Sequence, residues 1–132
     1  MHGRSQIIGY RGTIPYYSQG YQKALRGVRN EMGLSNVIIM LPFVRTPQER
    51  KNTIEIMEKR GVNALQVYVM CEIPANVIIA DEFLKAFYGY GTDSNNLTQL
   101  TLGVDYGSGI ISHLFDEHNE TTKRMIKIAI DT

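Results

Sequence analysis

Continuous apolar runs alternate along this chain with stretches in which apolar residues recur every three or four positions. The continuous runs lie at residues 36–41, 65–72 and 88–92, and they read as strands, the third one weakened by two glycines. The periodic stretches predict helices, in chain order, at residues 21–32, 46–60 and 74–87, a short helix or turn at 94–102, and a last helix after 119. This alternation favours an α/β fold with a parallel sheet and right-handed crossovers.

Capping residues mark several of the expected helix ends. Thr46 and Pro47 open the second helix, and Glu49 is placed to complete a capping box. Gly33 suits a left-handed cap after the first helix, and Asn119 can cap the last one.

The apolar positions also predict the core. Because the first two strands are apolar at nearly every position, we expect both of their faces to be covered. The side chains expected to face the core are those of Met40, Met57, Met70, Val77, Ile78, Ala80, Phe83, Leu84, Phe87 and Met125.

Composition narrows the class of protein. Fourteen Lys and Arg against thirteen Asp and Glu give a net charge of +1, without the basic stripe that nucleic acid or an anionic membrane would require. The longest apolar run, Val37 to Leu41, is too short to cross a bilayer. The single cysteine, Cys71, excludes an internal disulfide and a zinc site of several thiolates, and we expect a cytoplasmic protein.

Polar residues follow the second and third predicted strands. Glu72 ends the second strand, and Asp93, Ser94, Asn95 and Asn96 follow the third. The carboxyl ends of parallel strands meet at one edge of a sheet, so these side chains are expected to share a pocket. A second interpretation stays open, in which Glu72 only favours the start of the next helix and the asparagines only form a turn or cap.

Five motifs in order carry a resemblance to a known family. They are Gly9-Tyr10-Arg11-Gly12, Leu41-Pro42-Phe43-Val44-Arg45-Thr46, Met70-Cys71-Glu72-Ile73-Pro74, the stretch from Ser94 to Asp105, and His113-Leu114-Phe115-Asp116-Glu117. Together they closely resemble the phosphoenolpyruvate-utilising enzymes, the phosphoenolpyruvate synthases in particular. The matching part is the barrel that binds phosphoenolpyruvate or pyruvate.

The resemblance implies a fold and a site. The fold would be a partial TIM-type (β/α) barrel with parallel strands, in which residues 1–132 form one partial domain and the rest of the barrel lies outside the chain. Pyruvate or phosphoenolpyruvate would bind at Mg²⁺, with Glu72 and Asn96 at the positions of the metal ligands. Substrate contacts would come from Arg11 and from the cluster around Ser94 and Asn95, although Arg11 can equally be a solvated loop residue.

Two residues depart from the family pattern. Asn96 replaces the second carboxylate ligand, and its neutral amide is expected to weaken the Mg²⁺ site. Asp93 stands where the family has glycine; it can replace the lost charge, but a side chain three positions earlier on a tight turn is expected to point elsewhere. Cys71 is expected to be a buried, inert neighbour of Glu72.

The chain is therefore not expected to turn over substrate alone. The resemblance makes it a part of a phosphotransferase that acts on pyruvate, without a catalytic residue of its own. The alternative is a non-catalytic interaction module, which pairs through its exposed strand edges with a second copy or with a complementing chain.

Overall fold

Three parallel strands form the centre of the molecule. The computed structural model describes residues 19–34, 36–59 and 66–132. Within them the sheet has the order β1 (Ile38–Leu41), β2 (Gln66–Cys71) and β3 (Tyr90–Thr92). Met40 pairs with Tyr68, and Met70 pairs with Gly91. The predicted α/β class and the parallel pairing are confirmed.

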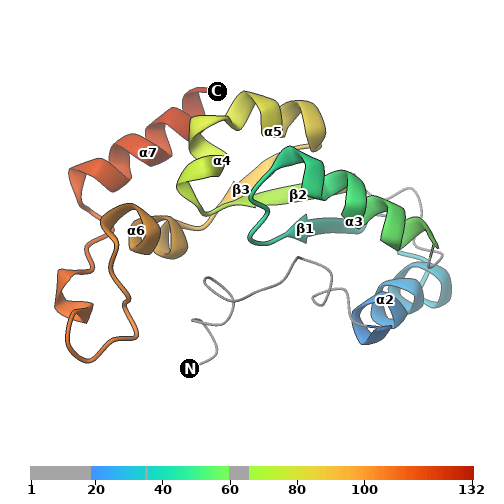
Figure 1. Cartoon of the computed structure of the whole chain (residues 1–132). Coiled ribbons are helices and arrows are strands. Elements are labelled where there is room, and N and C mark those ends of the chain that lie inside the picture. The colour runs from blue at the N-terminus through green and yellow to red at the C-terminus, as the bar shows by residue number, and fades with distance from the viewer. Residues whose placement is uncertain (1–18, 35, 60–65) are drawn as a thin grey trace.

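Helices connect the strands, and most of those after β1 lie on one side of the sheet (Figure 1). They are α2 (Gln19–Arg26), continued by a π-helical turn at Gly27–Glu31, α3 (Pro47–Lys59), α4 (Pro74–Ile78), α5 (Ala80–Ala86), α6 (Ser94–Leu102) and α7 (Glu120–Asp131), with a 3₁₀ turn at Ser112–Leu114. In Figure 1, α3, α4, α5 and α7 lie along the upper side of the sheet, while α6 lies beyond the end of β3. The helix expected at 94–102 has the predicted bounds.

The helix expected at 74–87 is broken in two at Ile79. That residue has φ −119° and ψ 41°, outside helical geometry, and it follows two other β-branched residues, which lowers the helix propensity of the segment. The break changes the direction of the chain, so Ile78 is 74% exposed instead of facing the core. The prediction for Ile78 is therefore wrong, while Val77, Ala80 and Phe83 are buried as expected.

Most of the predicted caps are present. Gly33 has φ 67° after the first helical segment, and the Asn119 side chain accepts a hydrogen bond from the Thr121 N–H. The Glu49 carboxylate reaches back to the start of α3, but it accepts from the Arg45 N–H at 3.0 Å, one residue earlier than a capping box requires.

The core lies between the helices and the covered face of the sheet. Its larger part joins the alternate β1 and β2 residues Ile39, Leu41, Val67 and Val69 to Met57 of α3 and to Phe83 and Phe87. A second part joins Cys71, Val77, Leu97 and Ala129, and the Tyr90 hydroxyl donates to the Ala129 carbonyl. These contacts fix α6 and α7 against the carboxyl ends of β2 and β3.

The opposite face of the sheet is only partly covered. Ile38 is 51% exposed and Met40 is 42% exposed, whereas Tyr68 and Met70 beside them are half-buried. Side chains alternate between the two faces of a strand, and in the described part of the chain the core helices pack on one of these faces. The prediction that both faces of the strands are covered is thus wrong for β1, as is the placement of Met40 in the core.

Met32 follows the π-helical turn and is 68% exposed. No helix in the described part of the chain is long and apolar enough to span a membrane.

Candidate functional site

Two carboxylates and one amide meet at the carboxyl ends of β2 and β3. Glu72 directly follows β2 and is 1% exposed, and Asp93 directly follows β3. The Asn96 Nδ2 donates to Glu72 Oε2 at 2.8 Å and to Asp93 Oδ2 at 2.8 Å. We call Glu72, Asp93 and Asn96 the carboxylate–amide cluster. The expected proximity of Glu72 and Asn96 is confirmed, while their roles stay predictions.

The start of α6 explains the position of Asp93. Asp93 is the N-cap residue, and its Oδ1 accepts a hydrogen bond from the Asn96 N–H at 3.1 Å. An N-cap side chain folds back over the third helical residue, which here is Asn96. The prediction that Asp93 points elsewhere is therefore wrong, because capping draws the two side chains together across the two intervening residues.

Backbone groups hold Glu72 from the side of β1. Its Oε1 accepts from the Phe43 N–H at 2.6 Å, and Phe43 has a φ of 51°, in the left-handed region that a bulky residue rarely adopts. This conformation directs the Phe43 N–H toward the buried carboxylate. The loop after β1 thus bears local strain at the point where it contacts the cluster.

Asn76 of α4 fixes the backbone on which Glu72 stands. Its Oδ1 accepts from the Glu72 N–H at 3.3 Å and the Ile73 N–H at 3.2 Å, and its Nδ2 donates to the Val44 carbonyl at 2.8 Å. Asn76 is 2% exposed, so these three bonds tie the ends of β1 and β2 together out of reach of solvent. The sequence analysis missed Asn76; its place at the third position of the helix that Pro74 opens was the available signal.

The surroundings of Glu72 disfavour its charged form. Burial raises the pKa of the Glu72 carboxyl above 4.5; the hydrogen bonds from Phe43 and Asn96 oppose that rise, and the nearby charge of Asp93 adds to it. Two carboxylates around one amide carry more negative charge than the amide can neutralise. The cluster therefore favours positive charge or a proton at this place.

The other predicted site residues lie apart from the cluster. The Ser94 hydroxyl donates to the Glu117 carboxylate at 3.3 Å, and Asn95 is exposed on the surface of α6. Arg11 lies outside the described residues. Cys71 is fully buried in the core, and burial together with the Glu72 charge raises its thiol pKa to about 11, which confirms a buried small residue.

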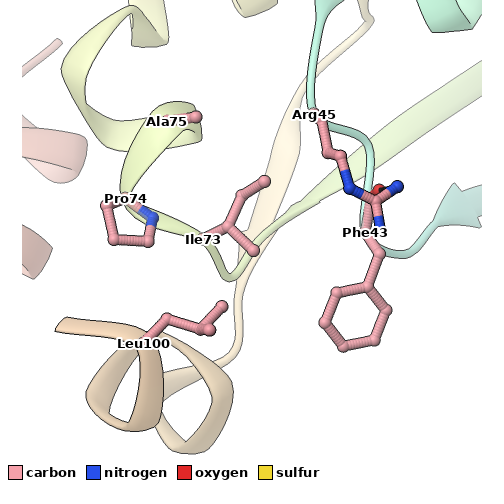
Figure 2. A pocket seen from close by; sticks show the side chains of 6 residues that line it. All are labelled: Phe43, Arg45, Ile73, Pro74, Ala75 and Leu100. Carbon is pink, nitrogen blue, oxygen red and sulfur yellow. Dashed lines mark hydrogen bonds between the residues drawn. The ribbon is translucent and has the colours of Figure 1, made fainter. Parts of the chain in front are cut away.

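A cavity of about 350 Å³ opens beside the cluster. Figure 2 shows Phe43 and Arg45 on one side of it, and Ile73, Pro74, Ala75 and Leu100 on the other. The Phe43 N–H donates a hydrogen bond to Glu72, and Ile73 follows Glu72 in the chain. Phe43 and Ile73 therefore lie between the cavity and the cluster.

Among the described residues that line this cavity, Arg45 is the one with a positive charge. Its Nη1 donates to the Phe43 carbonyl at 3.4 Å, which leaves most of the guanidinium donors for a ligand. The sequence analysis quoted Arg45 in a motif but did not consider it as a site residue. Its place in the loop that follows a strand, at the edge where Glu72 was expected, could have identified it.

The comparisons with known proteins place the chain in a family. The model of the PEP-utilising enzyme family, PEP-binding domain, matches residues 4–132. The chain belongs to the PEP-utilising enzymes. It is 51% identical to a phosphoenolpyruvate synthase of Synechocystis sp., 49% identical to that of Helicobacter pylori and 48% identical to that of Pseudomonas aeruginosa. These alignments cover 94–96% of the chain but only 17% of each relative.

The donor atoms of this PEP-utilising enzyme domain do not fit a magnesium ion as they stand. Among residues 19–34, 36–59 and 66–132, no group of three or more His, Cys, Asp and Glu side chains could hold a metal. Glu72 and Asp93 offer carboxylate oxygens, but Asn96 turns its N–H donors toward them. Mg²⁺ requires oxygen ligands, whereas Asn96 presents its NH₂ end, and not its Oδ1, to the space between the two carboxylates.

Proposed function

We propose that this chain is the part of a phosphoenolpyruvate synthase that binds pyruvate or phosphoenolpyruvate, in an enzyme that transfers a phosphoryl group from ATP to pyruvate. The observation that carries the proposal is the cavity with Arg45 in its wall, next to the carboxylate–amide cluster. The family match over residues 4–132 supports it and does not favour a non-catalytic interaction module.

The cavity suits a small organic acid. The Arg45 guanidinium can form a two-pronged pair with a carboxylate or phosphate, as planar guanidinium groups do. Ile73, Pro74 and Leu100 offer an apolar wall to the methyl group of pyruvate or the methylene group of its enol phosphate. We therefore expect Arg45 to hold the anion and the apolar wall to exclude water from the three-carbon skeleton.

We further propose that Mg²⁺ binds at this edge only weakly. Glu72 and Asp93 supply two carboxylates, and Asn96 supplies none, so the charge at the second ligand position predicted from the resemblance is lost. The contacts that the resemblance assigns to Arg11, Ser94 and Asn95 stay predictions. Alone, the chain should bind ligand without turning it over.

The finer fold that we propose is part of a TIM-type barrel. In such a barrel the helices cover the outer face of the sheet, and the inner face is filled by side chains from the other strands. Among residues 19–34, 36–59 and 66–132 the core helices cover one face, and the apolar residues Ile38 and Met40 are exposed on the other. Parallel strands with this one-sided cover are what a sector of a barrel would present.

Calorimetric titration of the chain with phosphoenolpyruvate, pyruvate and oxalate, a planar mimic of the pyruvate enolate, tests the proposal. Arg45→Gln removes a charge-assisted bond and is expected to weaken binding about 10- to 100-fold. The matched control is Arg124→Gln, since Arg124 pairs with Glu120 on the exposed surface of α7 and is part of neither cavity nor cluster. Equal losses in both variants, or no binding of any of the three acids at millimolar concentration, would refute the proposal.

Thermal melting tests the magnesium part separately. Magnesium with oxalate is expected to raise the melting temperature above the value reached with oxalate alone, and Glu72→Gln is expected to remove that increment. An increment that persists in Glu72→Gln would show that the ion binds elsewhere.

A further inference from the structure

The amide group of Asn96 has a fixed orientation, set first by the two carboxylates. Its Nδ2 lies 2.8 Å from Glu72 Oε2 and 2.8 Å from Asp93 Oδ2. An ionised carboxylate only accepts hydrogen bonds, so both contacts require the NH₂ end of the amide. Turning the amide over would bring its oxygen against two acceptor oxygens.

A second set of contacts fixes the same orientation from the other side. Asn96 Oδ1 accepts from Gln99 Nε2 at 3.3 Å, and Gln99 Oε1 accepts from the Tyr106 N–H at 3.4 Å. Gln99 is 6% exposed. A backbone N–H can only donate, so Tyr106 determines which end of Gln99 faces it, and Gln99 then determines which end of Asn96 faces the carboxylates.

This arrangement places donor hydrogens where a cation would otherwise lie. The two N–H groups of Asn96 donate hydrogen bonds to Glu72 and Asp93 but bring no positive charge, which a bound cation would supply. For a divalent cation to bind there, Asn96 has to turn over and present Oδ1. Gln99 would then have to turn as well, which would set its NH₂ group against the Tyr106 N–H.

We propose that Gln99 is a positioning residue that, anchored by the Tyr106 backbone, holds Asn96 in the orientation that weakens the binding of a divalent cation at the carboxylate–amide cluster. The turn that follows α6 thereby controls the cation affinity of the site. This deepens the proposed function by naming what weakens the Mg²⁺ site, and its test uses the cation alone, without any organic acid.

A substitution in the turn after α6 tests whether the Tyr106 N–H holds Gln99 in place. The Ser108 N–H donates to the Asp105 carbonyl at 3.0 Å, so Tyr106 is the second residue of a four-residue β-turn, a position that proline favours. Tyr106→Pro removes the N–H that anchors Gln99 and keeps the turn. Tyr106→Ala is the matched control, because it also removes the phenol ring of Tyr106 but keeps the backbone N–H.

The measurement is Mn²⁺ binding by electron paramagnetic resonance, repeated with Mg²⁺ by calorimetry. Tyr106→Pro is expected to bind Mn²⁺ at least about fivefold more tightly than Tyr106→Ala, since one opposing hydrogen bond has gone. Gln99→Met, which adds no charge, should tighten binding similarly. Asn96→Asp, which turns the amide into a carboxylate, should bind most tightly, whereas Asn95→Asp adds the same charge on the exposed neighbour and should change little.

The outcomes show whether Gln99 holds the orientation of Asn96 and whether the cluster is a cation site. Equal Mn²⁺ affinity in Tyr106→Pro and Tyr106→Ala, when both retain the circular dichroism of the parent chain, overturns the proposal. So does an Asn96→Asp variant that binds no better than Asn95→Asp, because the cluster would then not be a cation site in any orientation. Should Tyr106→Pro fail to fold, the comparison of Gln99→Met with the parent chain decides in the same way. Failure of the organic acids to bind would leave these cation results unchanged and would refute only the proposed function.

Discussion

Replacing Asn76 with alanine tests how the strand ends are held beneath the site. The change removes an acceptor shared by the Glu72 and Ile73 N–H groups and a donor to the Val44 carbonyl. Asn76 is 2% exposed, so solvent cannot readily replace these partners. The variant leaves three backbone groups without their bonds at the point where β1, β2 and α4 meet.

The expected loss follows from the number of bonds. A buried hydrogen bond contributes about 1 kcal/mol net, so three of them amount to about 3 kcal/mol of the free energy of unfolding. For a chain of this size that loss corresponds to a melting temperature lower by about 10 °C. It would be a large part of the stability of an ordinary domain, which is about 5–15 kcal/mol.

Urea denaturation followed by circular dichroism measures this loss. Asn52→Ala is the control, since Asn52 is exposed on α3 and the same atoms are deleted. The control should change the free energy of unfolding by less than about 0.5 kcal/mol. If Asn76→Ala costs no more than Asn52→Ala, the three bonds do not hold the strand ends, and the account of how Glu72 is positioned is wrong.

Three further predictions concern Glu72, Cys71 and Gly103. Between pH 4.5 and the raised pKa of Glu72, the folded chain binds more protons than the unfolded chain, so stability should fall as the pH rises. Denaturation of Glu72→Gln over the same pH range should lack this fall; an unchanged slope contradicts the raised pKa. With a thiol pKa of about 11, Cys71 should resist a thiol reagent at neutral pH and react once urea unfolds the chain; rapid labelling of the folded chain would contradict its burial. Gly103→Ala should cost about 1–2 kcal/mol in urea denaturation, because Gly103 has φ 66°, and Gly109→Ala should cost less; equal costs would count against the left-handed cap.

The sequence predicted the order and type of the elements because local patterns determine them. Strands β1, β2 and β3 lie within the predicted apolar runs, and α6 begins after Asp93 and ends before Gly103 as expected. The errors concern which face is covered. An apolar run such as 36–41 does not show whether both of its faces will be covered by other parts of the protein. In the described chain Ile38 and Met40, which share one face of β1, remain 51% and 42% exposed.

The site was predicted in part, for a reason that differs between its residues. Glu72 and Asn96 could be placed near each other because parallel strands bring their carboxyl ends together. Asp93 was misjudged because its direction depends on capping geometry. Asn76 and Gln99 were not recognised, since Val44 lies far from Asn76 in the sequence and Tyr106 contacts Gln99 across a turn. Arg45 was not recognised because the other wall of its cavity comes from distant segments.

The unfavourable features of this structure gather at one place, which is an argument that the place has a function. Burial raises the pKa of Glu72, the charge of Asp93 adds to that rise, and Phe43 adopts a left-handed backbone conformation beside them. None of these features is needed to close the core, which Val77, Leu97 and their apolar neighbours already fill. Features that cost stability without serving the core are expected where binding requires them. The Asn96 amide then has a specific role: it donates a hydrogen bond to each of the two carboxylates that lie together at this place.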